Sequence, residues 1–273
     1  MKQGVKLPRI FPSEPNPYEQ LNFRPADNDV VLCSYPASGE DIVLKILEKL
    51  RDRDRRIFRT VGDSLGSIGS GLHVTHLPFC RSRWNPRARY VLLLRNPKQV
   101  CVSFYYLFKK TFQRLYGRAP EENCSFNTFY RLFVNGKVAY GDYFRHTRSW
   151  LERTCIKSCL CEERSSVPDT ENLIILIYEE MENDLEHNLH RLIEFIDVDV
   201  DASRVSEEIK ETLLRKQSLD CRDFSSSEGR RKKMGLAGGW ESHFSKEHRT
   251  SFDEWVRWNG NASIYNKFWF DAL

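Results

Sequence analysis

One short stretch of the sequence, CSYPASGEDI, has the spacing of a loop that could bind a phosphate. It places Ser38 and Gly39 in a tight turn between an apolar run and a helical segment, where backbone N–H groups can point at an anion. The side chains lack the matching charge, because Ala37 stands where a cation would help and Glu40 and Asp41 stand where the anion would sit. Acidic residues also cap the first turn of a helix, which is a competing explanation for them. The stretch is a phosphate loop, a remnant of one or an ordinary turn.

Two other stretches place polar side chains directly after apolar runs. In RNPKQVCVS, Arg95 and Ser103 could bind one phosphate together, through a guanidinium fork and a hydroxyl. In VTHLPF, His76 could act as a general base, because the usual pKa of histidine lies near neutral pH. On spacing alone, a surface arginine and a helix serine without a shared ligand explain Arg95 and Ser103 better than a phosphate site. Most single histidines are not catalytic, so His76 alone is a weak indication.

Strands and helices alternate along the sequence, and these elements must position the polar residues. Short apolar runs predict strands at 29–34, 73–79, 90–94 and 172–178. Helical periodicity and capping residues predict helices that begin near 41, 97, 125, 143, 184, 202 and 246. This order predicts a single α/β domain with a mostly parallel sheet that is covered by helices on both faces. Ligands of such sheets bind beyond the carboxyl ends of the strands, which is where the three stretches would meet.

The composition narrows the function classes. Lys and Arg number 42 and Asp and Glu number 38, so the net charge of +4 does not indicate a nucleic-acid partner. No apolar run reaches the ~18 residues that a membrane span needs, and no apolar leader opens the chain. We therefore expect a cytosolic protein that acts without nucleic acid or membrane. Residues 1–22, rich in proline and polar groups, are expected to form an arm ahead of a domain at 23–273.

Eight cysteines are scattered along the chain and are expected to be free thiols in the cytosol. Cys155, Cys159 and Cys161 form a cluster in the segment CIKSCLC. Structural zinc usually needs a second pair of ligands at regular spacing, and the sequence shows none. We therefore expect no metal site.

Six motifs, taken in order, resemble those of the cytosolic sulfotransferase family. They are FRPADNDVVLCSYPxSG, THLPF, YVLLLRNPKxVxVSFY, GDYFRHTRSWLE, LIILIYEEM and GLAGGW, and they extend over about residues 20–258. Each motif alone is weak, whereas six in the right order are specific. The resemblance implies a P-loop-kinase-like α/β fold around a parallel sheet. It also implies transfer of a sulfuryl group from 3′-phosphoadenosine 5′-phosphosulfate (PAPS) to a hydroxyl or amine of a small molecule.

The same resemblance implies a role for individual residues. His76 corresponds to the catalytic base, and Arg95 and Ser103 correspond to the pair that holds the 3′-phosphate of the donor. Tyr178 corresponds to a tyrosine at the adenine. Further donor-binding positions are Ser38, Gly39, Lys233 and Gly235, and positions in the acceptor pocket are Phe144 and His146. The aromatic residue Phe79 suggests an apolar or phenolic acceptor, although aromatic side chains equally often form plain core.

The loop departs from the family pattern YPKSGTTW. The lysine that neutralises charge on the bridging oxygen is Ala37, and the two threonines that bind the 5′-phosphate are Glu40 and Asp41. Loss of one group that stabilises developing charge commonly raises a barrier by roughly 2.7–4 kcal/mol. The family's dimerisation stretch is also not recognisable in ESHFSKEHRT.

Three hypotheses follow from these departures. The first is an active sulfotransferase in which another cation, for example from the segment RRKK, replaces the missing lysine. The second is a catalytically impaired relative that binds a nucleotide or serves as a scaffold. The third, an ordinary P-loop kinase, is disfavoured because the sequence contains no GxxxxGK[ST] motif. His76 and its flanking residues are intact, so the sequence favours the first hypothesis.

Overall fold

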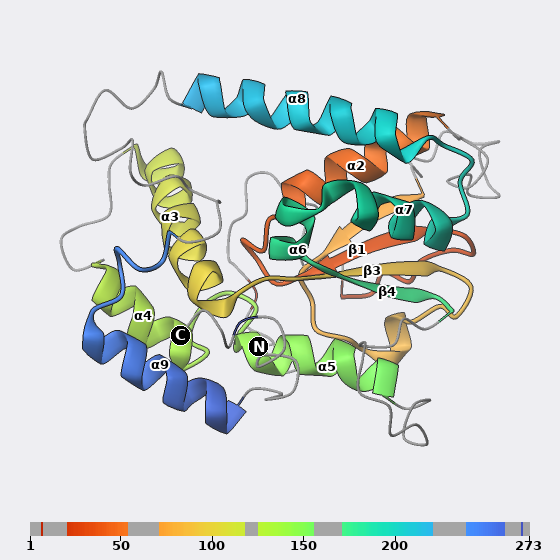
Figure 1. Ribbon diagram of the computed structural model, residues 1–273. Coiled ribbons are helices and arrows are strands. Elements are labelled where there is room, and N and C mark those ends of the chain that lie inside the picture. Colours follow the sequence, from red (N-terminus) through yellow and green to blue (C-terminus); the bar gives the residue numbers. More distant parts are fainter. Residues whose placement is uncertain are drawn as a thin grey trace.

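A four-stranded parallel sheet forms the centre of the protein, as the sequence predicts (Figure 1). The computed structural model describes residues 7, 21–53, 71–117, 125–155, 171–220, 239–259 and 269. The strands are β1 (Val30–Ser34), β2 (Leu72–Thr75), β3 (Arg89–Leu94) and β4 (Leu173–Ile177), in the spatial order β2-β1-β3-β4. Pairing is in parallel throughout, with Val30 opposite both Leu72 and Arg89. All four strands therefore end at the same edge of the sheet.

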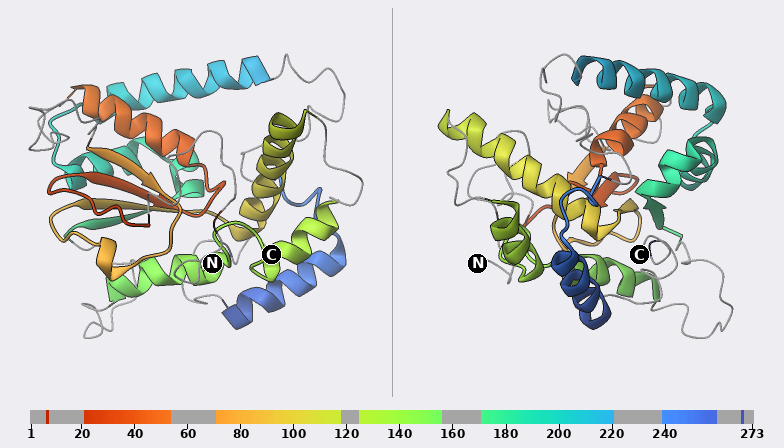
Figure 2. Two further views of the ribbon diagram at one scale, coloured as in Figure 1. Left: turned by 180° about the vertical axis from the view of Figure 1, so that it is seen from behind. Right: turned by 60° about the vertical axis from the view of Figure 1, so that its left-hand side comes forward.

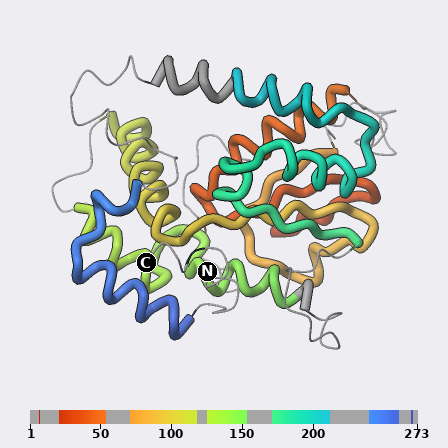
Figure 3. Tube along the Cα trace, in the orientation of Figure 1, coloured from red at the N-terminus to blue at the C-terminus, as the bar shows by residue number. Residues whose placement is uncertain are grey.

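Helices cover both faces of this sheet (Figure 2), and each face has its own apolar layer. Alternate residues of a strand point to opposite faces, so Val30 and Leu32 belong to one layer and Val31 and Cys33 to the other. The first layer includes helices α2 (Glu40–Arg53), α6 (Tyr178–Asn183), α7 (Leu185–Ile196) and α8 (Ala202–Asp220). The second includes α3 (Pro97–Tyr116), α4 (Phe126–Val134), α5 (Tyr143–Cys155) and α9 (Lys246–Asn259). Figure 3 shows α8 running along the outer side of α2.

Local sequence explains where several helices begin and end. The Asn96 side chain accepts a hydrogen bond from the Lys98 N–H, and Pro97 occupies the first turn of α3. Gly117 ends the same helix in the left-handed conformation, with φ +64°. Asp184 caps α7 in the same way as Asn96 caps α3, by accepting from the N–H of His187.

Two elements differ from the sequence-based expectation. Strand β2 ends at Thr75, so His76 and the following Leu-Pro segment lie beyond the sheet rather than inside a strand at 73–79. The six-residue helix α6 starts directly after β4, and it is too short to produce a helical period in the sequence. Most of the predicted arm lies outside the described residues, although Leu21 is buried in the core and Leu7 packs against it.

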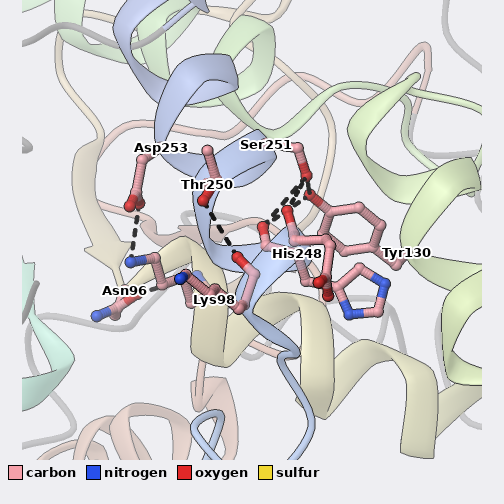
Figure 4. Close-up of polar contacts among 9 residues, drawn as sticks. Asn96, Lys98, Tyr130, His248, Thr250, Ser251 and Asp253 are labelled. Carbon is pink, nitrogen blue, oxygen red and sulfur yellow. Dashed lines mark hydrogen bonds and ion pairs between the residues drawn. The ribbon is translucent and has the colours of Figure 1, made fainter.

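Buried contacts attach α9 to the site-bearing part of the fold (Figure 4). The Lys98 ammonium lies 2.9 Å from an Asp253 carboxylate oxygen and 4.6 Å from the centre of the Trp240 ring. The Tyr130 hydroxyl lies 2.7 Å from the Ser251 hydroxyl, which joins α4 to α9. Lys98 is 2% exposed, so its charge depends on the Asp253 carboxylate for compensation. Within the described ranges, no helix combines the length and the apolar character that crossing a membrane requires.

Replacement of Asp253 should destabilise the protein, because it leaves a buried ammonium without its counter-charge. We expect Asp253→Asn to lower the free energy of unfolding by about 3 kcal/mol, the lower end of the range for a broken buried pair, since the carboxylate is partly exposed. Chemical denaturation measures the change. The control is Glu254→Gln, at an exposed position on the same helix, with an expected change within about 0.5 kcal/mol. Equal effects of the two variants would contradict the role of the pair.

Candidate active site

Residues from all four strand ends meet at the carboxyl edge of the sheet. His76 directly follows β2, Arg95 directly follows β3, and Tyr178 directly follows β4. The loop of residues 35–39 follows β1, which lies between β2 and β3. The parallel topology thus brings together the three stretches that the sequence singles out, and it adds Tyr178 to them.

The loop after β1 has the backbone of an anion-binding turn. Ala37 has φ +63° and Gly39 has φ +90°, and turns of this kind direct successive N–H groups to one side. A Cβ atom on Gly39 would lie only 2.2 Å from Cε2 of Tyr178, so the ring packs directly on the loop. Glycine at position 39 is therefore required both by its φ angle and by the contact with the ring.

Arg95 connects the loop to two other elements. The guanidinium is 2% exposed, and Nη1 donates hydrogen bonds to the Ala37 carbonyl at 3.1 Å and to the Ser103 hydroxyl at 3.2 Å. Its central carbon lies 4.2 Å from the centre of the Tyr178 ring. Burial raises the pKa of the Tyr178 hydroxyl well above its usual range, and the nearby Arg95 charge opposes this effect only in part. The guanidinium and the Ser103 hydroxyl are thus adjacent in this structure, an arrangement suited to binding one phosphate.

His76 is oriented by the end of the neighbouring strand. Its Nδ1 lies 2.9 Å from the Ser34 carbonyl oxygen and 3.2 Å from the Ser34 hydroxyl, and the residue is 2% exposed. A carbonyl can only accept, so this contact assigns the proton to Nδ1 and leaves Nε2 as the basic nitrogen. The Nε2 atom lies 3.8 Å from a Glu40 carboxylate oxygen.

Glu40 turns back into the loop from the first residue of α2. Its Oε1 accepts a hydrogen bond from the Ala37 N–H at 3.3 Å, and its side chain is 18% exposed. Its Oε2 is fully buried and has no hydrogen-bond partner among the described residues, and the same is true of the Ser38 hydroxyl. Asp41, in contrast, is exposed. One of the two carboxylates that replace the family's threonines therefore lies in the loop, and the other does not.

The remaining predicted residues have different environments. Phe79 is partly buried between Trp84 and Trp150 and lines a cavity of about 40 Å³. Phe144 is buried, and its ring centre lies 4.5 Å from that of Trp255 in α9. Lys233 and Gly235 lie outside the described residues, as do the RRKK segment, Cys159 and Cys161.

His146 is buried in the second apolar layer, 1% exposed, with its ring centre 5.5 Å from that of Tyr35. Neither ring nitrogen has a hydrogen-bond partner among the described residues. Burial, together with the nearby His76, lowers the pKa of His146 to about 3. His146 is therefore a neutral ring at neutral pH, and it cannot supply the cation that the loop lacks.

Sequence reasoning did not identify three residues that support the site. The Tyr143 hydroxyl donates to the Arg95 carbonyl at 2.7 Å. The Glu179 carboxylate accepts from the Asn96 N–H at 2.9 Å and from the Trp269 indole at 3.0 Å. Ser34 orients His76. All three lie within the six motifs quoted for the family resemblance, and Ser34 in addition ends a predicted strand and directly precedes the loop.

Gly39→Ala should disrupt the loop by forcing the added methyl group into the Tyr178 ring. We expect a loss of about 2–4 kcal/mol in the free energy of unfolding, from the left-handed backbone cost of about 1–2 kcal/mol plus overpacking. Gly117→Ala is the matched control, because Gly117 has a similar positive φ but no atom within 4 Å of an added Cβ. Gly117→Ala should lower the free energy of unfolding only by the part that comes from the left-handed backbone conformation. Equal losses in the two variants would show that the ring contact contributes nothing.

His146 should make stability depend on pH in mildly acidic solution. Its pKa in the folded state, about 3, lies below its usual value of 6.5, so the unfolded chain binds the extra proton and stability falls as pH drops from about 6.5 toward 3. Between pH 7.5 and pH 5, this residue should account for a loss of about 2 kcal/mol. Chemical denaturation of the wild type and of His146→Phe at both pH values isolates the contribution. An identical pH dependence in both proteins would contradict it.

Comparisons with known proteins agree on one family. A family model described as the sulfotransferase domain matches residues 70–266. Sulfotransferase 1E1 of Rattus norvegicus is 24% identical, over 92% of this chain and 89% of that protein. The 3-beta-hydroxysteroid sulfotransferase of Cavia porcellus is 25% identical, over 92% of this chain and 91% of that protein.

Solved structures show the same fold. Mouse sulfotransferase SULT7A1, complexed with PAP, is 20% identical and has a TM-score of 0.63, covering 95% of this chain and 94% of that one. Retinol dehydratase, in complex with androsterone and PAP, is 17% identical with a TM-score of 0.55, covering 89% of this chain and 82% of that one. The family match begins after the altered loop, so it rests on the strands, helices and strand-end residues from β2 onward. With this parallel sheet and these strand ends, the chain belongs to the sulfotransferase family.

Proposed function

We propose that this protein transfers a sulfuryl group from PAPS to a hydroxyl or amine of a small molecule. The observation that carries the proposal is the position of His76, whose Nδ1 is engaged by the Ser34 carbonyl and whose Nε2 faces the loop after β1. A histidine held in this way can accept a proton from an acceptor that enters beside the loop. The adjacent Arg95 and Ser103 supply donors for a phosphate on the same edge of the sheet.

Each residue has a defined part in this reaction. Arg95 and Ser103 bind the 3′-phosphate, and the Tyr178 ring packs near the adenine. The backbone of Ser38 and Gly39 contacts the 5′ end. His76 takes the proton of the attacking hydroxyl or amine while a bond forms between that atom and sulfur. The bond between sulfur and the bridging phosphate oxygen breaks, and adenosine 3′,5′-bisphosphate (PAP) leaves with the electron pair.

A specific observation favours a second candidate, a catalytically impaired relative that binds the nucleotide. Ala37 supplies no cation at the bridging oxygen, and the Glu40 carboxylate occupies the loop at the Ala37 N–H. Lys98 does not compensate, because its ammonium is paired with Asp253 at 2.9 Å. Negative charge at this point opposes the charge that develops on the leaving phosphate. The acceptor class, phenolic or amine, and the cytosolic location stay predictions from the sequence.

Calorimetry with PAP and a transfer assay with radiolabelled PAPS, run on a panel of phenols and amines, distinguish the two candidates. The transferase should bind PAP and label at least one acceptor. His76→Ala should reduce transfer by at least about 100-fold, the usual contribution of a general base, while PAP binding changes little. His190→Ala, at an exposed position on α7, is the control and should leave transfer unchanged.

The possible results distinguish the transferase from the impaired relative. Binding of PAP without transfer to any acceptor would favour the impaired relative. Absence of PAP binding would overturn the transferase. Transfer that survives in His76→Ala would remove His76 from the mechanism.

A further inference from the structure

We propose that Glu40 sets the nucleotide selectivity of this site by competing with the 5′-phosphate for the loop after β1. The chemical class that the site would favour is a 3′-phosphorylated adenosine with a free 5′-hydroxyl, over the corresponding 3′,5′-bisphosphate. The inference rests on the proposed function, because it assumes that the nucleotide lies along this edge of the sheet. A sulfuryl donor with a charged 5′ end, such as PAPS, then binds only when the Glu40 carboxylate leaves its position.

An anion of the chain itself occupies the loop. The backbone at Ala37 and Gly39 has positive φ angles, which shape the turn for an anion, and the Ala37 N–H already donates to Glu40 Oε1 at 3.3 Å. This carboxylate is held inside the site, since its side chain is only 18% exposed. A 5′-phosphate at the same N–H would have to displace it or lie beside it.

Two buried polar atoms at the loop have hydrogen-bonding capacity left. Among the described residues, neither the Ser38 hydroxyl, in a residue that is 1% exposed, nor Glu40 Oε2 has a partner. Buried polar atoms usually find a partner, so each of these two atoms is open to a hydrogen bond from a ligand. A 5′-hydroxyl is both donor and acceptor, so it can bond to either atom. A phosphate dianion only accepts, so it cannot satisfy the carboxylate oxygen.

Charge is unevenly distributed around the loop. In the described part of the chain, the side chain that faces the Glu40 carboxylate is His76, at 3.8 Å between Nε2 and Oε1, and it carries a positive charge only when Nε2 is protonated. The Arg95 guanidinium contacts the loop through the Ala37 carbonyl. The same nitrogen, Nη1, also donates to the Ser103 hydroxyl. Lys98 is committed to Asp253. The positive charge therefore lies toward the 3′-phosphate position, and the negative charge lies at the 5′ position.

The test compares two commercially available nucleotides on the full chain. Isothermal calorimetry at about 0.15 M salt measures the affinities for adenosine 3′-phosphate and for PAP, since surface charge effects are then damped. The wild type should bind adenosine 3′-phosphate at least as tightly as PAP. Glu40→Gln keeps a carbonyl oxygen for the Ala37 N–H and removes the charge, so it should raise PAP affinity about tenfold or more while the affinity for adenosine 3′-phosphate falls or stays unchanged.

Asp41→Asn is the matched control. It removes one negative charge from the same helical turn, but at an exposed side chain, so PAP affinity should change by less than about threefold. A wild type that prefers PAP by tenfold or more, with that preference unchanged in Glu40→Gln, overturns the role of Glu40 and leaves the nucleotide site intact. Binding of neither nucleotide to any of the three proteins overturns the proposed function, and this inference with it. The wild-type comparison alone decides the question should Glu40→Gln fail to fold.

Discussion

The Arg95 guanidinium lies where the ends of β1, β3 and β4 approach one another, and the arrangement of the site depends on its contacts. It bonds the Ala37 carbonyl and the Ser103 hydroxyl, and it lies against the Tyr178 ring. A buried charge is costly unless polar groups surround it, so these contacts are coupled to one another. The Tyr178 ring in turn packs on Gly39, which requires a residue without a side chain. One cation thus fixes the loop, the start of α3 and the start of α6 together.

Charge compensation explains why the altered loop keeps its shape. In a loop built for a phosphate, the anion belongs to the ligand. Here the Glu40 carboxylate accepts from the Ala37 N–H and also faces His76. The chain thereby supplies its own anion, which stabilises the turn in the absence of a nucleotide. Under the proposed function, the same replacement places negative charge where the leaving phosphate develops its own, so loop stability and transfer chemistry are in conflict at this position.

Much of the fold could be predicted from local pattern. The apolar runs at 90–94 and 172–178 correspond to β3 and β4, and the helix expected from Lys246 begins there. These predictions hold because a buried parallel strand and an amphipathic helix have strong local periods. Helix α6 was not predicted, since six residues are fewer than two helical turns. The predicted strand at 73–79 was too long, because the run of β-forming residues continues past the point where pairing with β1 ends.

For the site, the residue types at each strand end follow from the sequence alone: His76, Arg95, Tyr178 and the loop from Tyr35 to Gly39. The absence of a lysine from the loop follows from it too. The contacts among those residues depend on the packed fold. Glu40 enters the loop whereas its neighbour Asp41 is exposed, and Lys98 is paired with Asp253 instead of facing the site. The reason is physical: adjacent helical residues point in different directions, and the partners of a buried charge come from distant segments that only the packed fold brings together.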